Sequence, residues 1–93
     1  MSDDRPYWML FYEYVPDIGE RRAPYREEHL ALIRSWKESG RLELAGALGD
    51  PPHSGAFVFR VDDAGEVDEF TAEDPYVANG LVTRRRVERW NVV

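Results

Sequence analysis

The stretch Tyr7-Trp8-Met9-Leu10-Phe11-Tyr12 decides how this chain folds. It continues to Val15 and ends at the turn-forming residues Pro16-Asp17-Ile18-Gly19, which predicts a strand over residues 7–15. Successive side chains of a strand point to opposite faces, so this strand carries large apolar side chains on both faces. One face can pack against helices of the same chain, and the other needs a separate cover.

Helices and further strands follow this first strand. Pro24 suits the first turn of a helix that runs to Ser39 and stops at Gly40. A short acidic helix is predicted around residues 66–71, and Asp74-Pro75 begins another helical turn that ends at Gly80. The remaining predicted strands cover residues 42–48, 56–61 and 83–93.

The resulting order, βαββαβ, predicts a ferredoxin-like α+β fold, in which a four-stranded antiparallel sheet has both helices on one face. The length of the chain predicts one domain over residues 1–93. A domain this small hides only roughly 60–65% of the surface that its unfolded chain exposes. Because the chain is 43% hydrophobic and 13% aromatic, we expect a homodimer in which a second copy covers the open sheet face.

Charge and composition exclude several partners and chemistries. The net charge of −6 argues against nucleic acid, because phosphate binding depends on Lys and Arg. The absence of cysteine excludes thiolate nucleophiles and disulfides and fits a reducing compartment. The longest apolar run, residues 7–12, is too short to span a membrane, and the N-terminus begins with acidic rather than basic residues. We therefore expect a cytoplasmic protein that contacts no membrane.

The sequence also favours a protein without a metal or a cofactor. Only two histidines are present, and His53 lies in a proline-rich loop with no ligand spacing around it. The glycines are scattered singly, so no glycine-rich phosphate loop is formed.

His29 is the main candidate for a functional residue. It falls within the apolar stripe of the predicted helix, in line with Tyr25, Leu32, Ile33 and Trp36. A histidine in that position is either a satisfied core or interface residue or a functional one. Its imidazole could accept a proton at physiological pH if a carboxylate fixed the tautomer.

Asp74 is the candidate for that carboxylate. It precedes Pro75 at a predicted helix start, where an aspartate is typical of an N-cap. The structural role and a functional one can coexist, because a carboxylate has enough acceptor sites for a backbone N–H and an imidazole. If the fold brings Asp74 to His29, the two form a general acid/base unit.

Arg22 and Arg26 lie one helical turn apart and in line with His29. They could form a clamp for a carboxylate or enolate substrate at the mouth of a cleft. The alternative is a solvated pair near a helix start, bridged to Glu20 or Glu27.

Several motifs together resemble the YciI-like family of the dimeric α/β-barrel superfamily. They are Arg22-x-x-x-Arg26-x-x-His29-Leu30, Gly40-Arg41-Leu42, Ala45-Gly46 and Asp74-Pro75-Tyr76-Val77-Ala78-x-Gly80. The resemblance covers residues 7–93 and implies a ferredoxin-like protomer whose sheets pack face to face. It also implies that His29 and Asp74 are the catalytic pair, with Arg22, Arg26 and Tyr76 as substrate-binding candidates. Ala47 departs from the pattern, since many relatives have proline there.

Two classes of function remain open on the sequence. The first is a small cofactor-free enzyme that uses the His29–Asp74 pair for proton transfer on a small polar metabolite, anionic or cyclic, as an isomerase, a lyase or a dehalogenating enzyme. The second is a non-catalytic dimer that binds a small molecule or a protein, because a fold alone never establishes catalysis. A cofactor-free monooxygenase is a weaker third hypothesis, since no residue selects for oxygen chemistry.

Overall fold

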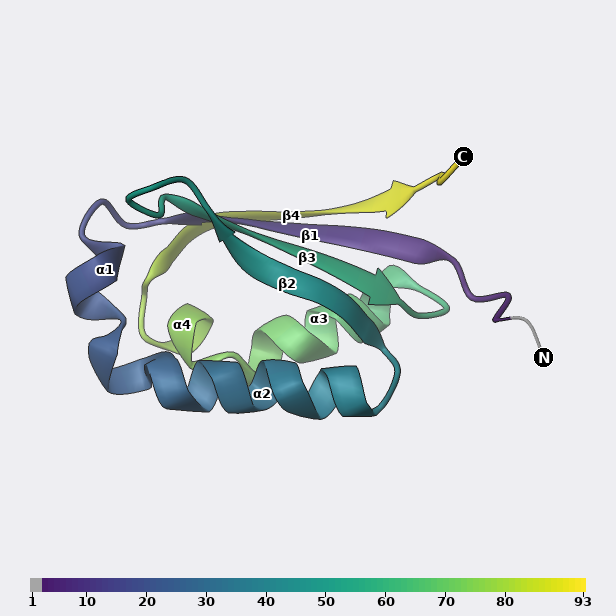
Figure 1. Cartoon of the computed structure of the whole chain (residues 1–93), viewed down its shortest axis with the longest axis horizontal. Coiled ribbons are helices and arrows are strands. Elements are labelled where there is room, and N and C mark those ends of the chain that lie inside the picture. The colour runs from purple at the N-terminus through teal and green to yellow at the C-terminus, as the bar shows by residue number, and fades with distance from the viewer. Residues whose placement is uncertain (1–2) are drawn as a thin grey trace.

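The computed structural model describes residues 3–93 and has one antiparallel sheet with helices on one side (Figure 1). Its strands are β1 (Tyr7–Tyr14), β2 (Leu42–Leu48), β3 (Ser54–Arg60) and β4 (Val82–Trp90), in the spatial order β2-β3-β1-β4. Its helices are α1 (Ile18–Arg21), α2 (Arg26–Glu38), α3 (Ala64–Glu73) and α4 (Pro75–Ala78), with a 3₁₀ turn, η1, at Ala23–Tyr25. This arrangement confirms the predicted ferredoxin-like α+β fold.

Several element boundaries differ from the sequence prediction. The last strand was expected to reach Val93 but ends at Trp90, because Trp90 pairs with Tyr7, the first residue of β1, and no strand lies beyond it. The turn predicted at residues 16–19 runs into α1, a single helical turn that buries Ile18. The predicted helix from Pro24 begins as η1 and becomes α2 at Arg26.

An aromatic cluster forms the core between the sheet and the helices. Phe57 and Phe59 of β3 are almost completely buried, and they contact Phe70 of α3 with ring centroids 5.4 and 5.3 Å apart, respectively. Trp36 of α2 meets Phe59 at 5.8 Å and Phe70 at 5.4 Å, both edge to face. These contacts fix both long helices on the same face of the sheet.

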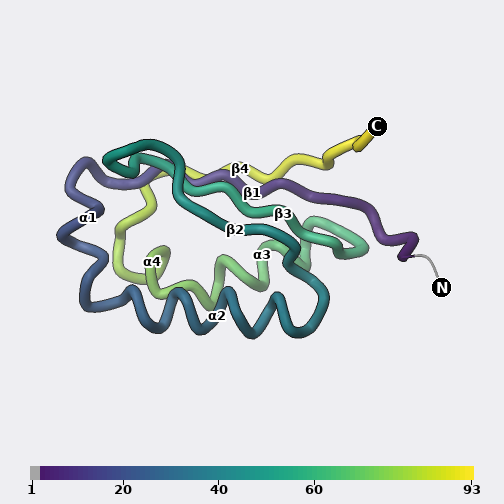
Figure 2. Tube along the Cα trace, viewed as in Figure 1, coloured from purple at the N-terminus to yellow at the C-terminus, as the bar shows by residue number. Residues whose placement is uncertain are grey.

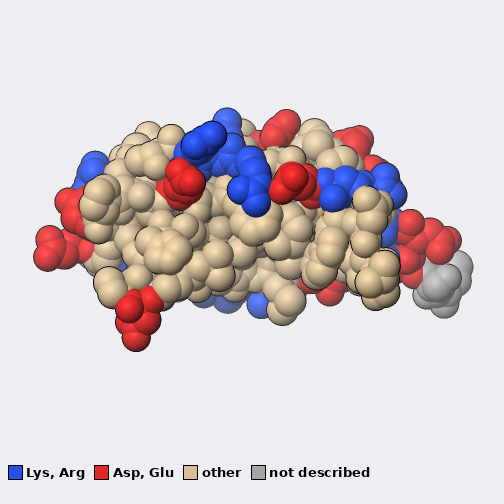
Figure 3. Space-filling model, turned by 90° about the horizontal axis from the view of Figure 1, so that it is seen from above, with Lys and Arg blue, Asp and Glu red and all other residues tan. Residues whose placement is uncertain are grey.

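None of the helices in residues 3–93 covers the other face of the sheet, which is seen from above in Figure 3. Met9 and Phe11 of β1 lie on this face, opposite Val58 and Ala56 of β3 in the register. The same face carries exposed apolar side chains at the sheet edges, with Leu44 65% exposed and Trp90 47% exposed. Arginines partly cover the apolar surface; the Arg86 guanidinium, for example, lies 4.3 Å from the centre of the Phe11 ring.

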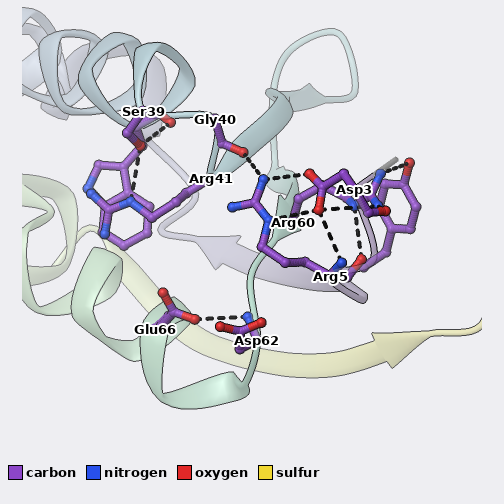
Figure 4. A network of polar contacts seen from close by, with 10 residues as sticks. Asp3, Arg5, Ser39, Gly40, Arg41, Arg60, Asp62 and Glu66 are labelled. Atoms are coloured by element: carbon purple, nitrogen blue, oxygen red, sulfur yellow. Dashed lines mark hydrogen bonds and ion pairs between the residues drawn. The ribbon is translucent and has the colours of Figure 1, made fainter. Parts of the chain in front are cut away.

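Asp3 and Arg5 are tied to Gly40 and to Arg60, the last residue of β3 (Figure 4). Arg5 donates hydrogen bonds to the Asp3 carboxylate and to the Gly40 carbonyl. Arg60 donates to the Tyr7 hydroxyl at 2.8 Å and to the Arg5 carbonyl at 3.0 Å. The network is largely solvent-exposed, and Arg5 holds the pKa of the Asp3 carboxyl well below its usual value.

The opposite end of the molecule is where distant segments converge. Figure 2 shows three segments near one end of the sheet, where β1 ends and β4 begins: α1, the first turns of α2, and α4. A second buried cluster holds them together and consists of Val15, Ile18, Tyr76 and Leu81. This packing brings polar residues of β1, α2 and the α3–α4 junction into one place.

The aromatic cluster is expected to dominate stability. Phe59→Ala removes a completely buried ring that contacts both helices, and it should lower the free energy of unfolding by about 3–5 kcal/mol. Val92→Ala, at a half-exposed position after β4, should cost less than about 0.5 kcal/mol. Denaturant unfolding measures both values, and equal losses in the two variants would contradict this assignment of the core.

Candidate functional site

The structure brings His29 and Asp74 into contact although they lie 45 residues apart in the sequence. Nδ1 of His29 is 2.8 Å from Oδ1 of Asp74. Asp74 is completely buried and His29 is 5% exposed, so the contact is shielded from solvent. A hydrogen bond of this length between an imidazole and a carboxylate fixes both side chains.

Asp74 is placed by the junction between α3 and α4. Its backbone is extended, with φ −76° and ψ 118°, because the residue before a proline is disfavoured in a helix and Pro75 occupies the first turn of α4. Its carboxylate also accepts a hydrogen bond from the Tyr76 backbone N–H at 3.0 Å and from the Tyr12 hydroxyl at 2.9 Å. These donors compensate for the burial of the carboxylate.

The ring of His29 is held by aromatic side chains as well as by Asp74. It stacks on Tyr76 with centroids 3.7 Å apart and planes 6° from parallel, and it meets Phe57 edge to face at 6.3 Å. Because an ionised carboxylate only accepts hydrogen bonds, the network assigns the ring proton to Nδ1. The lone pair of Nε2, on the opposite edge of the ring, is then free to accept a proton.

A cleft of about 360 Å³ opens beside His29, between α2 and the strands β2 and β3. This volume suits a small molecule. Asp74 is not among the residues that line the cleft, so it lies behind the histidine. The cleft is lined by Tyr14, Arg22, Arg26, His29, Leu30, Ile33, Lys37, Ala45, Gly46, Ala47, Phe57 and Tyr76.

The three predicted substrate-binding residues, Arg22, Arg26 and Tyr76, all line this cleft. Tyr76 is 2% exposed, and its hydroxyl oxygen is buried without a hydrogen-bond partner among the described residues. Burial raises the pKa of this hydroxyl, and the positive charge of the nearby Arg26 guanidinium opposes the rise. The two groups form no hydrogen bond in this structure. An unpaired buried hydroxyl of this kind can donate a hydrogen bond to a ligand.

Sequence reasoning missed Tyr12, Tyr14 and Lys37 as parts of the site. Tyr12 donates to the carboxylate of Asp74, whereas Tyr14 and Lys37 line the cleft. One signal could have found Tyr12: it alternates with Leu10 on the core face of β1, and a tyrosine hydroxyl in a core needs a partner. Tyr14 continues the same alternation, whereas Lys37 carried no comparable signal.

The remaining findings concern metals and membranes. Among residues 3–93, no group of three or more His, Cys, Asp or Glu side chains is arranged to hold a metal ion. His53 lies in an exposed loop, where its Nδ1 is 2.8 Å from Oγ of Ser54. None of the helices in the described part of the chain has the length and apolar character to cross a membrane.

The fold and the site define a small ferredoxin-like α+β protein with a buried His–Asp contact beside a ligand-sized cleft. The model of the YCII-related domain family matches residues 7–91, so the chain belongs to this family, as its motifs predicted. An uncharacterized protein of Haemophilus influenzae is 29% identical over 84 residues, a span that covers 81% of this chain and 86% of the relative.

Solved structures share the ferredoxin-like α+β fold of this chain. The 5-chloro-2-hydroxyhydroquinone dehydrochlorinase of Burkholderia phenoliruptrix is 22% identical, with a TM-score of 0.75, over 91% of this chain and 93% of that chain. A dimeric ferredoxin-like protein from an uncultured marine organism is 16% identical, with a TM-score of 0.57, over 98% of this chain and 90% of that chain. At these identities the likeness concerns the fold alone.

Alkaline pH is expected to unfold the protein through its buried tyrosines. Burial is the main cause that raises the pKa of Tyr12, Tyr14 and Tyr76 above the ordinary value of 10.0, and the negative charge of Asp74 contributes. The folded state therefore holds these phenol protons more tightly than the unfolded state does. Their stabilising contribution is complete below pH 10.0 and is lost as the pH rises above it, so the free energy of unfolding should fall there.

Tyrosinate absorbance and denaturant unfolding, measured across this pH range, test the expectation. The Tyr12→Phe variant should lose one late-titrating group and show a shallower fall of stability with pH. Ionisation of all five tyrosines at the ordinary value, in protein that stays folded, would be the contrary result.

Proposed function

We propose that this protein is a small acid/base enzyme that needs no cofactor and moves a proton on a small polar metabolite, anionic or cyclic. The observation that supports this proposal best is the contact between the buried Asp74 and a His29 ring that lines the cleft. A carboxylate in this position keeps the ring in one tautomer and stabilises the imidazolium that forms when the ring takes a proton. The isomerase, lyase and dehalogenating reactions all share this step.

In the proposed reaction, Nε2 of His29 takes a proton from a carbon or oxygen of the substrate. The electron pair of the broken bond moves onto a substrate oxygen, which becomes an enolate or a phenolate. Arg22 and Arg26, which line the same cleft together with Tyr76, bind this negative charge. His29 then returns the proton at another atom in an isomerisation, or a halide leaves with its bonding electrons in an elimination.

A structural neighbour suggests where the search for a substrate should start. The Burkholderia protein is a dehydrochlorinase for 5-chloro-2-hydroxyhydroquinone, and its structure holds 2,5-dihydroxybenzoquinone. Both compounds are small hydroxylated rings with acidic oxygens. We therefore propose hydroxylated cyclic compounds as the first class to test on this chain.

The second candidate function is a non-catalytic binding protein. Its support is the burial of His29, which is 5% exposed and stacked on Tyr76, as a packing residue is. In that case the cleft binds a small molecule that leaves unchanged. The two candidates differ in what His29 does for turnover and for stability.

Substitution of His29 separates them. His29→Gln should remove the proton acceptor and lower chloride release from 5-chloro-2-hydroxyhydroquinone, or exchange of its ring protons with deuterated water, by about 10²-fold or more. Asp74→Asn should cause a loss of similar order, because it leaves the ring without its orienting carboxylate. His53→Gln is the matched control, because this other histidine lies in an exposed loop, and it should retain the wild-type rate.

Thermal melting accompanies the rate measurement. A folded His29→Gln variant without turnover supports the enzyme. Turnover that persists in this variant, or a wild-type protein that binds such rings without converting them, excludes the acid/base role of His29.

We further propose that the protein is a homodimer in which the open sheet faces pack against each other, with the cytoplasm as its predicted location. The apolar side chains of β1 on that face and the dimeric neighbour support this arrangement. Face-to-face packing related by a two-fold axis covers apolar surface that no helix of the chain reaches.

Phe11→Glu tests the proposed dimer, because it places a charge on the face that would be buried. Sedimentation should show wild-type dimers and Phe11→Glu monomers at the same concentration. The control Ala31→Glu adds the same charge at an exposed position of α2 and should remain dimeric. A wild-type monomer, or a Phe11→Glu dimer of unchanged affinity, would rule the interface out.

A further inference from the structure

We propose that Tyr14 is a further substrate-binding residue, whose hydroxyl donates a hydrogen bond to an acidic oxygen of a substrate bound as its anion. The substrate class is then an enol or phenol that carries its charge on oxygen. This inference rests on the proposed function and deepens it, since it names the ionised form of the substrate that the cleft selects. It concerns binding, so it can be tested without turnover.

The position of Tyr14 supports this role. Tyr14 ends β1 just after an irregularity in the β1–β4 register between Glu13 and Tyr14, and its side chain lines the cleft. The cleft therefore has Tyr14 on the wall formed by the sheet and Arg26 and His29 on the wall formed by α2. A ligand between the two walls can be contacted from both.

Gly55 makes room for the Tyr14 hydroxyl. A Cβ built at Gly55 would lie 2.5 Å from Oη of Tyr14, which is far inside contact distance. Gly55 has no positive φ, so the backbone does not require a glycine there. The missing side chain leaves space for the tyrosine ring to cross β3 toward the cleft.

The positively charged side chains around Tyr14 favour an anionic ligand. Arg22 and Arg26 line the same cleft, and none of the described side chains that line it is acidic. The Tyr76 ring lies 6.1 Å from the Tyr14 ring at an interplanar angle of 79°, and the Tyr76 hydroxyl has no partner among the described residues. Burial raises the pKa of Tyr14, so its hydroxyl keeps its proton and remains a donor.

The hydrogen-bond donors of the cleft and the proposed proton acceptor, His29, suit a ligand whose negative charge is on oxygen. The Tyr14 hydroxyl and the guanidinium groups of Arg22 and Arg26 can donate hydrogen bonds there, and a negatively charged oxygen is the acceptor that suits them best. Apolar side chains, Leu30, Ile33 and Phe57, line the cleft beside these groups and suit the carbon skeleton of a ring. An ionised phenol fulfils both requirements.

The test uses 4-nitrophenol, whose phenolate absorbs visible light, and 4-nitroanisole, its methyl ether, as a neutral control. Wild-type protein should bind the phenolate more tightly than the phenol and the ether, so its addition at a pH near the probe's pKa should increase the phenolate band. Tyr14→Phe should weaken phenolate binding by about tenfold or more, as expected for a lost hydrogen bond to a charged group. Binding of the ether should change less than about twofold.

Gly55→Ala supplies a second variant that acts through the same hydroxyl. It should weaken phenolate binding in the wild-type background and have a smaller further effect in Tyr14→Phe. In that variant the 2.5 Å contact of the new methyl group with the hydroxyl is absent, and only its contacts with Phe57 at 3.1 Å and with the ring carbon Cζ at 3.2 Å remain. Equal effects of Gly55→Ala in both backgrounds would overturn the proposal. So would a Tyr14→Phe protein that binds the phenolate as the wild type does, or a wild type without preference for the phenolate.

The His29→Gln variant distinguishes this inference from the proposed function. Phenolate preference that survives in His29→Gln and falls in Tyr14→Phe supports the role of Tyr14 even if no turnover is found. Turnover that depends on His29, together with phenolate binding that does not depend on Tyr14, refutes the inference and leaves the enzyme in place.

Discussion

The structure depends on one buried carboxylate. Asp74 has no exposed surface, and a carboxylate in that position is tolerated only when hydrogen bonds replace its hydration. The donors come from three separate elements: the Tyr12 hydroxyl of β1, the His29 ring of α2 and the Tyr76 backbone N–H of α4. Since each bond has a defined length and direction, the carboxylate fixes the sheet, the long helix and the last helical turn relative to one another.

The same constraint prepares the histidine for chemistry. An imidazole on an apolar helix face could adopt either tautomer and several rotamers, but the contact with Asp74 and the parallel stacking on Tyr76 leave one arrangement. In that arrangement Nδ1 is occupied by Asp74, Nε2 lies on the opposite edge of the ring, and His29 lines the cleft. Asp74 and Tyr76, which stabilise the fold, therefore also determine which ring nitrogen is available to a ligand. The proposed enzyme would then need little rearrangement of His29 before proton transfer.

How far the sequence predicts this site depends on whether each signal is local. The alternation in residues 7–12, the proline at position 24 and the Asp74-Pro75 pair are local patterns, and they predicted the first strand, the main helix and the cap near their observed positions. The contact of Tyr12 with Asp74 spans 62 residues and depends on how the α3–α4 junction packs under β1. The position of the Tyr14 side chain depends on the space that Gly55 of the neighbouring strand β3 leaves for it. The alternation of residues along one strand does not reveal such a contact. The early end of β4 likewise follows from the register with Tyr7.

The two faces of β1 connect the site to the proposed dimer. Leu10 and Tyr12 point toward the helices and form core and site, whereas Met9 and Phe11 point to the open face. A shift of the register by one residue would exchange these sets, so the strand can hold Tyr12 on Asp74 only while Phe11 stays on the outer face. Burial of the outer face by a second copy would therefore stabilise the register that keeps the carboxylate satisfied. In this way the proposed association at one face of the sheet would support the geometry of the cleft on the other.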